Sequence, residues 1–247
     1  MKAIKIGITG GNGFIGRHLS SALKKSGYKP FYFDLPENNL VSPDQAQLKK
    51  FVKKADVIFH LAGVNRGADI EIVGGSVVAT YNLAEAIKKY NPKTKIVFSS
   101  SIQAENDSVY GRSKLLAENI LEELANNLGI EVSILRLTNV FGEGGKPFYN
   151  SVVATFASQA VKGVNLPISD PKRELRLIYV KDVISEFLKE LKMNRKNKLL
   201  LKKIDSKGSI TVGRLAELMV GFAKKSINPK TKLEKELHKT FLSYAKS

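Results

Sequence analysis

The spacing of apolar positions changes repeatedly along the first 140 residues. Short runs that are apolar at almost every position and rich in β-branched residues predict strands at 4–8, 30–33, 57–61, 96–100 and 132–137. Between them, apolar residues recur every three or four positions and predict helices at 14–26, 45–54, 73–90 and 109–127. Strands that are apolar on both faces are typical of a parallel sheet covered by helices. We therefore expect an α/β fold, a Rossmann-type doubly wound parallel sheet.

The alternation loosens after residue 142. The pattern there predicts strands at 175–180 and 199–203 and helices at 151–161, 183–192 and 211–225, with a last helix after Pro229. This part is too short for an independent core. We therefore expect one domain over 1–247, in which 1–142 mainly binds a dinucleotide and 143–247 forms mainly a small C-terminal substrate lobe.

A glycine-rich motif links the first predicted strand to the first predicted helix. Its spacing is Gly-x-x-Gly-x-x-Gly, which permits a tight turn, a close approach of a pyrophosphate to the backbone, and close packing of the helix. The helix N-terminus adds N–H donors and a partial positive charge for the phosphates. The expected cofactor contacts in this motif are Gly10, Gly13, Phe14, Ile15, Gly16 and Arg17.

Two charged residues point to different dinucleotides. Asp34 ends the second predicted strand, where a carboxylate can accept hydrogen bonds from ribose hydroxyls and would repel a 2′-phosphate. Arg17 offers a positive charge to such a phosphate. The residues therefore predict an NAD(P)(H) site and leave NAD and NADP open, with Asp34 favouring NAD.

A second motif supplies candidate proton-transfer groups. Tyr110 and Lys114 are four residues apart on a predicted helix and so share one face. A neighbouring ammonium lowers the pKa of a phenol, so we expect Lys114 to lower the pKa of Tyr110. Serines 99–101 end the fourth predicted strand, at the edge of the sheet where ligands bind in this fold class. Serine, tyrosine and lysine beside a nicotinamide form a site for carbonyl–alcohol redox chemistry.

Together with residues 56–62, these motifs resemble the extended short-chain dehydrogenase/reductase family, also called the NAD-dependent epimerase/dehydratase family. The resemblance covers about residues 1–185 and implies an NAD(P)-dependent oxidoreductase acting on a nucleotide sugar. It selects Ser101 as the catalytic serine with Tyr110 and Lys114, whereas strand alternation would also allow Ser99. Ser76 stands where many members have asparagine. The further cofactor contacts it implies are Leu61, Ala62, Gly63, Ser99, Tyr110 and Lys114.

A narrower resemblance concerns residues 60–66, 99–104 and 149–156. They are similar to the reductase half of bifunctional capsular-polysaccharide enzymes, whose other half is a cupin epimerase and which make UDP-N-acetyl-6-deoxy-L-talosamine. This likeness implies NADPH-dependent reduction of the C4 keto group of a nucleotide-linked, UDP-type deoxy sugar for a surface polysaccharide. It reaches residues 242–244 and no cupin follows, so we expect either a separate epimerase as partner or a 4-keto sugar that needs no epimerisation. The implied substrate contacts are Arg66, Asn139, Tyr149, Asn150, Ser151 and Arg176.

The composition of the chain bears on metal binding, disulfides and membrane association. The chain has no cysteine, which excludes disulfides and zinc–thiolate sites, and its three histidines lack metal-ligand spacing, so we expect no metal. No apolar run is long enough to span a bilayer, and we expect a cytoplasmic protein without a membrane partner. The resemblance also implies a homodimer through the helix that carries Tyr110.

Three rival functions stay open. A nucleotide-sugar 4-epimerase and a dTDP-4-keto-sugar reductase would use the same serine, tyrosine and lysine. A non-catalytic dinucleotide-sensing or nucleic-acid-binding protein is the rival from another class, suggested by the net charge of +17. The basic excess is concentrated in residues 181–247, where aromatic residues for base stacking are few. We therefore do not expect nucleic acid as a partner.

Overall fold

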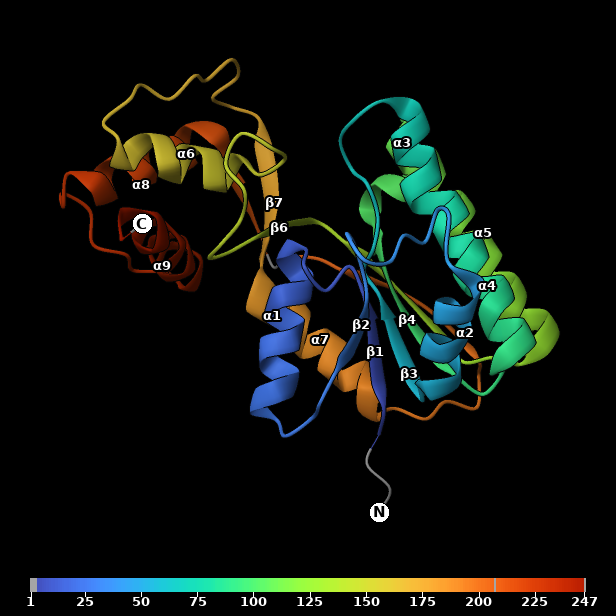
Figure 1. Ribbon diagram of the computed structural model, residues 1–247. Coiled ribbons are helices and arrows are strands. Elements are labelled where there is room, and N and C mark those ends of the chain that lie inside the picture. The colour runs from blue at the N-terminus through green and yellow to red at the C-terminus, as the bar shows by residue number, and fades with distance from the viewer. Residues whose placement is uncertain (1–3, 207, 247) are drawn as a thin grey trace. The chain divides into compact units, whose positions relative to one another are not determined.

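The computed structural model describes residues 4–206 and 208–246 and divides into two compact units (Figure 1). The first unit comprises residues 1–137 and 184–204, and the second comprises residues 138–183 and 205–247.

The first unit is built on one parallel sheet of six strands in the order β2-β1-β3-β4-β5-β8. The strands are β1 (Ile6–Thr9), β2 (Phe31–Phe33), β3 (Val57–His60), β4 (Lys95–Ser101), β5 (Val132–Leu137) and β8 (Leu199–Ile204). The strand order reverses at β1, because β2 pairs with β1 on one side and β3 pairs with it on the other. This is the switch point at which doubly wound sheets bind ligands. The predicted fold class is confirmed.

Helices cover both faces of this sheet (Figure 1). One face carries α1 (Phe14–Lys25) and α7 (Val180–Lys192), and the other carries α2 (Gln45–Lys54), α4 (Ala79–Tyr90) and α5 (Val109–Leu128). Consecutive strand residues serve opposite faces: Ile58 belongs to the apolar core with α2, α4 and α5, whereas the ring of Phe59 lies 6.0 Å from that of Phe187 on α7. The continuous apolar strands therefore reflect burial on both sides.

The predicted single helix at 73–90 is wrong in its start and its continuity. The segment begins earlier with α3 (Asp69–Val73), widens into a π-helical turn (Gly74–Val78) and continues as α4. At Gly75 an added Cβ would lie 2.9 Å from Val64 Cβ, so the side chain of Val64 packs directly on the backbone where the helix widens. A 3₁₀ turn at Ile102–Glu105 was also not predicted.

In the residues that the structure describes, the second unit contains a small sheet and three helices. In the sheet, β6 (Asn139–Phe141) pairs parallel with β7 (Glu174–Tyr179), which pairs antiparallel with β9 (Ser209–Thr211). The helices are α6 (Val152–Val161), α8 (Val212–Ala223) and α9 (Lys232–Ala245). The sequence pattern missed β6 and β9, because three residues are too few to show a period.

Residues 184–204 belong to the first unit, although the sequence pattern groups them with the second part. They supply most of α7 and the sixth strand, β8, which pairs with β5. The division of roles at residue 142 stays a prediction. Among the described residues, no helix is both long and apolar enough to cross a membrane.

Candidate functional site

The glycine motif forms a tight loop between β1 and α1. Gly10 has a φ of +74°, and a Cβ there would lie 2.6 Å from the backbone nitrogen of Ala62. At Gly16 a Cβ would collide with the backbone of Gly10 and Gly11. These two positions therefore require glycine for the turn and for the packing of the helix.

The same loop leaves the start of α1 open to an anion. The residue before the helix is Gly13, and within the described residues no side chain caps the helix. The first turn therefore carries N–H groups, among them those of Phe14 and Ile15, that a pyrophosphate can accept from. This uncapped cradle fits a dinucleotide.

Asp34 lies beside this loop. Its carboxylate accepts hydrogen bonds from the backbone N–H of Asn12 at 2.7 Å and of Leu35 at 3.0 Å. Asp34 thus ties the end of β2 to the loop, in the position expected of a ribose acceptor. The guanidinium of Arg17 donates to the backbone oxygen of Asn12 at 2.7 Å, so both charged residues adjoin Asn12.

The serines that end β4 point in different directions. Ser100 Oγ donates to Glu118 Oε1 at 2.5 Å and is buried. Ser101 Oγ accepts from the backbone N–H of Gln103 at 3.1 Å, and Ser101 lies close enough to the Tyr110 phenol to affect its pKa. The structure therefore brings Ser101 together with Tyr110.

Tyr110 stands in the first turn of α5, which Ser108 caps by accepting from the N–H of Gly111 at 3.0 Å. Burial raises the pKa of Tyr110, and the hydrogen bond from Ser101 opposes that rise. The expected lowering of this pKa by Lys114 is therefore wrong here, because desolvation of the phenolate is the larger effect. Tyr110 is a neutral phenol at neutral pH.

Lys114 lies one turn further along α5 and is buried. Its Nζ donates to the backbone oxygen of Ser99 at 3.0 Å and lies 4.8 Å from the centre of the Phe98 ring. Burial lowers the pKa of Lys114 to about 8, against the charge of Glu118, which raises it. Lys114 and Ser76 adjoin the same space: a Cβ on Gly63 would lie 3.3 Å from Lys114 Nζ and 3.8 Å from Ser76 Oγ.

His60, at the end of β3, has a structural role. Its Nδ1 lies 2.7 Å from Thr9 Oγ1 and its Nε2 lies 3.0 Å from Thr80 Oγ1. Thr80 donates its own proton to the backbone oxygen of Ser76, so Nε2 of His60 is the donor and Nδ1 the acceptor. Burial lowers the pKa of His60 to about 3, with a smaller effect from Lys114, and the ring stays neutral.

Glu118 is a site residue that sequence reasoning missed. It lies four residues after Lys114 on α5, is 1% exposed, and pairs with Arg136 of β5, whose Nε lies 2.9 Å from Glu118 Oε1. Arg136 Nη1 also pairs with Glu105 at 2.9 Å. The four-residue spacing from Lys114 was the available signal, but a glutamate on a helix is usually exposed.

The other cofactor candidates lie where β3 ends. Leu61 follows β3, and its N–H donates to the backbone oxygen of Thr9 at 3.0 Å. Ala62 lies close to Gly10, and Gly63 and Arg66 are exposed in the loop that follows. Among the described residues there is no group of three or more histidine, aspartate or glutamate side chains that could hold a metal.

The remaining substrate candidates lie in the second unit. Asn139 begins β6 and donates to the backbone oxygen of Arg176, and the guanidinium of Arg176 pairs with Asp205 at 2.7 Å. Ser151 caps α6 by accepting from the N–H of Ala154. The exposed Asn150 precedes Ser151, and the ring of Tyr149 lies 5.3 Å from Lys146 Nζ.

Comparison with known proteins decides the family. Residues 6–199 match the model of the NAD dependent epimerase/dehydratase family. The chain belongs to this family. The family is described as NAD dependent, which supports a nicotinamide dinucleotide as the cofactor of this chain.

Three relatives within or near this family are similar along almost the whole chain. UDP-2-acetamido-2,6-beta-L-arabino-hexul-4-ose reductase of Pseudomonas aeruginosa is 36% identical, over 98% of this chain and 65% of its own length. The crystal structure of the capsular polysaccharide assembling protein CapF from Staphylococcus aureus is 31% identical with a TM-score of 0.77, over 98% of this chain and 65% of CapF. This chain thus spans about 65% of both relatives.

The third similar protein, whose structure is solved, is UDP-glucose 4-epimerase of Thermotoga maritima with UDP-glucose, with a TM-score of 0.86 at 22% identity. It covers 98% of this chain and 99% of the epimerase, and supports the fold alone. The resemblance to the extended short-chain family and to the capsular reductases is confirmed.

Proposed function

We propose that this member of the epimerase/dehydratase family reduces the C4 keto group of a UDP-linked deoxy sugar, as a step in surface-polysaccharide precursor synthesis. The observation that carries the proposal is that Ser101 lies beside Tyr110, with the buried Lys114 one turn away, at the sheet edge that also holds the glycine loop. The 36% identical relative is named a reductase of a UDP-linked hexul-4-ose.

The first unit would hold the dinucleotide. The N–H groups at the start of α1 would bind the pyrophosphate, and Asp34 would accept from the adenosine ribose. Lys114 would donate to the nicotinamide ribose. When bound, the reduced nicotinamide supplies a hydride to the carbonyl carbon.

Tyr110 would act as the general acid. Its raised pKa keeps the phenol protonated at neutral pH, which is the state a reductase needs to give a proton to the carbonyl oxygen. Ser101 would donate a hydrogen bond to the same oxygen and then to the phenolate of Tyr110, which regains its proton from solvent. The ammonium of Lys114 would stabilise that phenolate.

The second unit would recognise the nucleotide sugar. Arg176 offers a guanidinium suited to a diphosphate, and Asn139 is bonded to its backbone. Tyr149, Asn150 and Ser151 offer hydroxyl and amide groups for the hexose. Arg66, in the first unit, would bind a phosphate of the cofactor or of the substrate.

A 4-epimerase is the nearest alternative, because a putative UDP-glucose 4-epimerase of Methanocaldococcus jannaschii is 27% identical over 97% of this chain and 90% of its own length. An epimerase returns the hydride to the same substrate and retains its cofactor. A reductase consumes one reduced dinucleotide for each sugar, so single-turnover stoichiometry separates the two functions.

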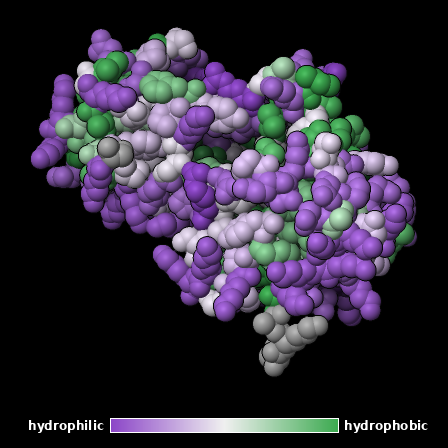
Figure 2. Space-filling model, viewed as in Figure 1, coloured by the Kyte–Doolittle hydropathy of each residue, from purple (hydrophilic) through white to green (hydrophobic). Residues whose placement is uncertain are grey.

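We propose that the partner of the chain is a second copy of itself. A homodimer is supported by exposed apolar side chains on α3, α4 and α5, where Ile70, Tyr81 and Leu116 are 78%, 53% and 48% exposed. Figure 2 shows apolar residues gathered at the end of the first unit that carries α3. Sedimentation of wild type and Leu116→Glu tests the dimer.

The deciding experiment titrates UDP, dTDP and GDP into the dinucleotide-loaded protein by calorimetry, and then offers UDP-linked 4-keto sugars with NADH or NADPH. UDP should bind in preference to the other two nucleotides, and a 4-keto sugar should be reduced with equal loss of reduced dinucleotide. If none of the nucleotides binds, the nucleotide-sugar function is wrong.

A further inference from the structure

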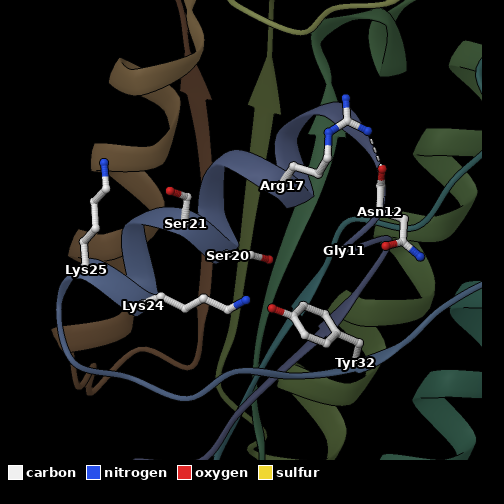
Figure 3. Close-up of a pocket in the computed structure, with 8 residues that line it drawn as sticks. All are labelled: Gly11, Asn12, Arg17, Ser20, Ser21, Lys24, Lys25 and Tyr32. Atoms are coloured by element: carbon white, nitrogen blue, oxygen red, sulfur yellow. Dashed lines mark hydrogen bonds between the residues drawn. The ribbon is translucent and has the colours of Figure 1, made fainter.

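A pocket with a volume of about 520 Å³ lies between α1 and the edge strand β2. One end of it is the glycine loop, and the other end is the last turn of α1 (Figure 3). The residues that line it are Gly11, Asn12, Arg17, Ser20, Ser21, Lys24, Lys25 and Tyr32.

The charged residues that line this pocket are all positive. Arg17, Lys24 and Lys25 are cationic, and none of the eight lining residues is acidic. Over residues 4–206 and 208–246, neither Lys24 nor Lys25 forms an ion pair. An anion entering the pocket therefore meets cations that are not already neutralised.

Ser20 adds a second, independent feature. It is only 8% exposed, and its Oγ has no hydrogen-bond partner among the described residues. Buried hydroxyls are nearly always hydrogen-bonded, so such a group needs a water or a ligand. Figure 3 shows the Ser20 hydroxyl directed to the same side of α1 as Lys24.

Tyr32 completes the group from β2. Its ring packs against Gly11, where an added Cβ would lie 2.5 Å from Tyr32 Cδ1. Gly11 is not one of the three motif glycines, so its missing side chain serves the ring of Tyr32. The hydroxyl of Tyr32 and Nζ of Lys24 point toward one another, while Ser21 and Lys25 extend from the other side of α1 (Figure 3).

We propose that this pocket binds a phosphate group. The ammonium of Lys24 supplies charge, and the hydroxyls of Ser20 and Tyr32 donate hydrogen bonds to separate phosphate oxygens. Arg17 closes the end beside the glycine loop. The phosphate comes either from the 2′ position of an NADP molecule bound at that loop, which rests on the proposed dinucleotide site, or from a separate phosphorylated small molecule.

The first experiment titrates inorganic phosphate into the full chain by calorimetry, at constant ionic strength kept with chloride. Wild type should bind phosphate saturably. Lys24→Gln should weaken binding at least about tenfold, because a charged hydrogen-bonding partner is lost. The charge-matched change Lys25→Gln should weaken it much less, because the side chain of Lys25 extends from the other side of α1. Circular dichroism confirms that each variant is folded.

Two smaller changes test the hydroxyls without removing charge. Tyr32→Phe and Ser20→Ala should each weaken phosphate binding. Ser20→Ala should also raise the melting temperature measured without phosphate, because it removes an unsatisfied buried hydroxyl and places alanine in a helix. A wild type that binds no phosphate, or equal losses in Lys24→Gln and Lys25→Gln, would overturn the pocket.

The second experiment identifies the source of the phosphate. NAD⁺ and NADP⁺ are titrated with and without saturating phosphate. If phosphate competes with NADP⁺ but not with NAD⁺, and Lys24→Gln weakens the binding of NADP⁺ alone, the pocket binds the 2′-phosphate. Binding of both dinucleotides that is independent of phosphate assigns it to a separate ligand. If wild type reduces a UDP sugar but binds no phosphate, only the proposal of a phosphate pocket is wrong. If wild type binds phosphate but does not bind UDP, only the proposed function is wrong.

Discussion

Glu118 and Arg136 join α5 to β5 through a buried ion pair. Arg136 Nη2 lies 2.5 Å from Glu118 Oε2, and Arg136 Nε lies 2.9 Å from Oε1. Ser100 donates to the same carboxylate, so the end of β4 is held to the helix that carries Tyr110 and Lys114. The relative position of Ser101 and Tyr110 therefore depends on a charge that neither residue carries.

Replacing Arg136 tests this arrangement. Arg136→Met leaves the carboxylate of Glu118 buried without its cation and should lower the free energy of unfolding by about 3–5 kcal/mol. The control is Lys88→Met, which breaks an exposed pair with Glu85 at 3.4 Å and should cost at most about 1 kcal/mol. Urea unfolding measures the free energy of unfolding of both variants. Equal losses of stability would contradict the structural role of the buried ion pair.

Tyr110→Phe tests the proposed proton donor. The variant keeps the ring and loses only the hydroxyl, so turnover should fall by about 100-fold or more while dinucleotide affinity stays near that of wild type. Stopped-flow reduction and fluorescence titration measure the two quantities. Near-normal turnover in Tyr110→Phe would remove Tyr110 from the mechanism.

Asp34 is expected to restrain the choice of dinucleotide, and wild type should accept both NADH and NADPH. Asp34→Ala should shift the ratio of affinities toward NADPH by about tenfold, because a nearby negative charge is removed. Asp34→Asn separates two effects, since it removes the charge and keeps an acceptor for the N–H of Asn12. An unchanged ratio in both variants would show that Asp34 does not face the ribose.

Lys114 should make dinucleotide binding sensitive to pH. Its pKa of about 8 means that the ammonium loses its proton as the pH rises through that value, so affinity should fall above pH 8. Lys114→Met should bind more weakly at all pH values and lose this dependence. The stability effect has the opposite direction: the unfolded lysine has a pKa of about 10.4, so wild type should gain stability relative to Lys114→Met between pH 8 and 10. A parallel alkaline fall in the variant would contradict the assignment.

Arg176 and Asp205 test the second unit. Arg176→Ala should lower the affinity for UDP by about tenfold, because a charged contact to the diphosphate is lost. Asp205→Asn should increase the affinity for UDP by up to about fivefold, since it frees the guanidinium of Arg176 from its ion pair at the surface. Asn150→Ala should mainly change which 4-keto sugar is reduced. Calorimetry with UDP checks the first two, and equal affinity in all variants would exclude Arg176.

Local patterns in the sequence were sufficient to predict the main strands and helices and the positions of the two motifs. The strand and helix periods, Gly10 at a positive φ, and the four-residue spacing of Tyr110 and Lys114 all act over a few neighbouring residues, so each could be predicted without a partner elsewhere. Helix α2 was predicted with its observed bounds, Gln45–Lys54.

Tertiary structure alone decided the features that depend on distant residues. The joining of β8 to β5, the ion pair of Glu118 with Arg136, and the placing of Ser20 opposite Tyr32 bring together segments with no common local pattern. The pKa of Tyr110 is the same kind of property: spacing predicts a neighbouring charge, whereas burial, which proved larger, depends on everything packed around the phenol. Period and spacing are properties of a segment, but desolvation and pairing belong to the folded chain.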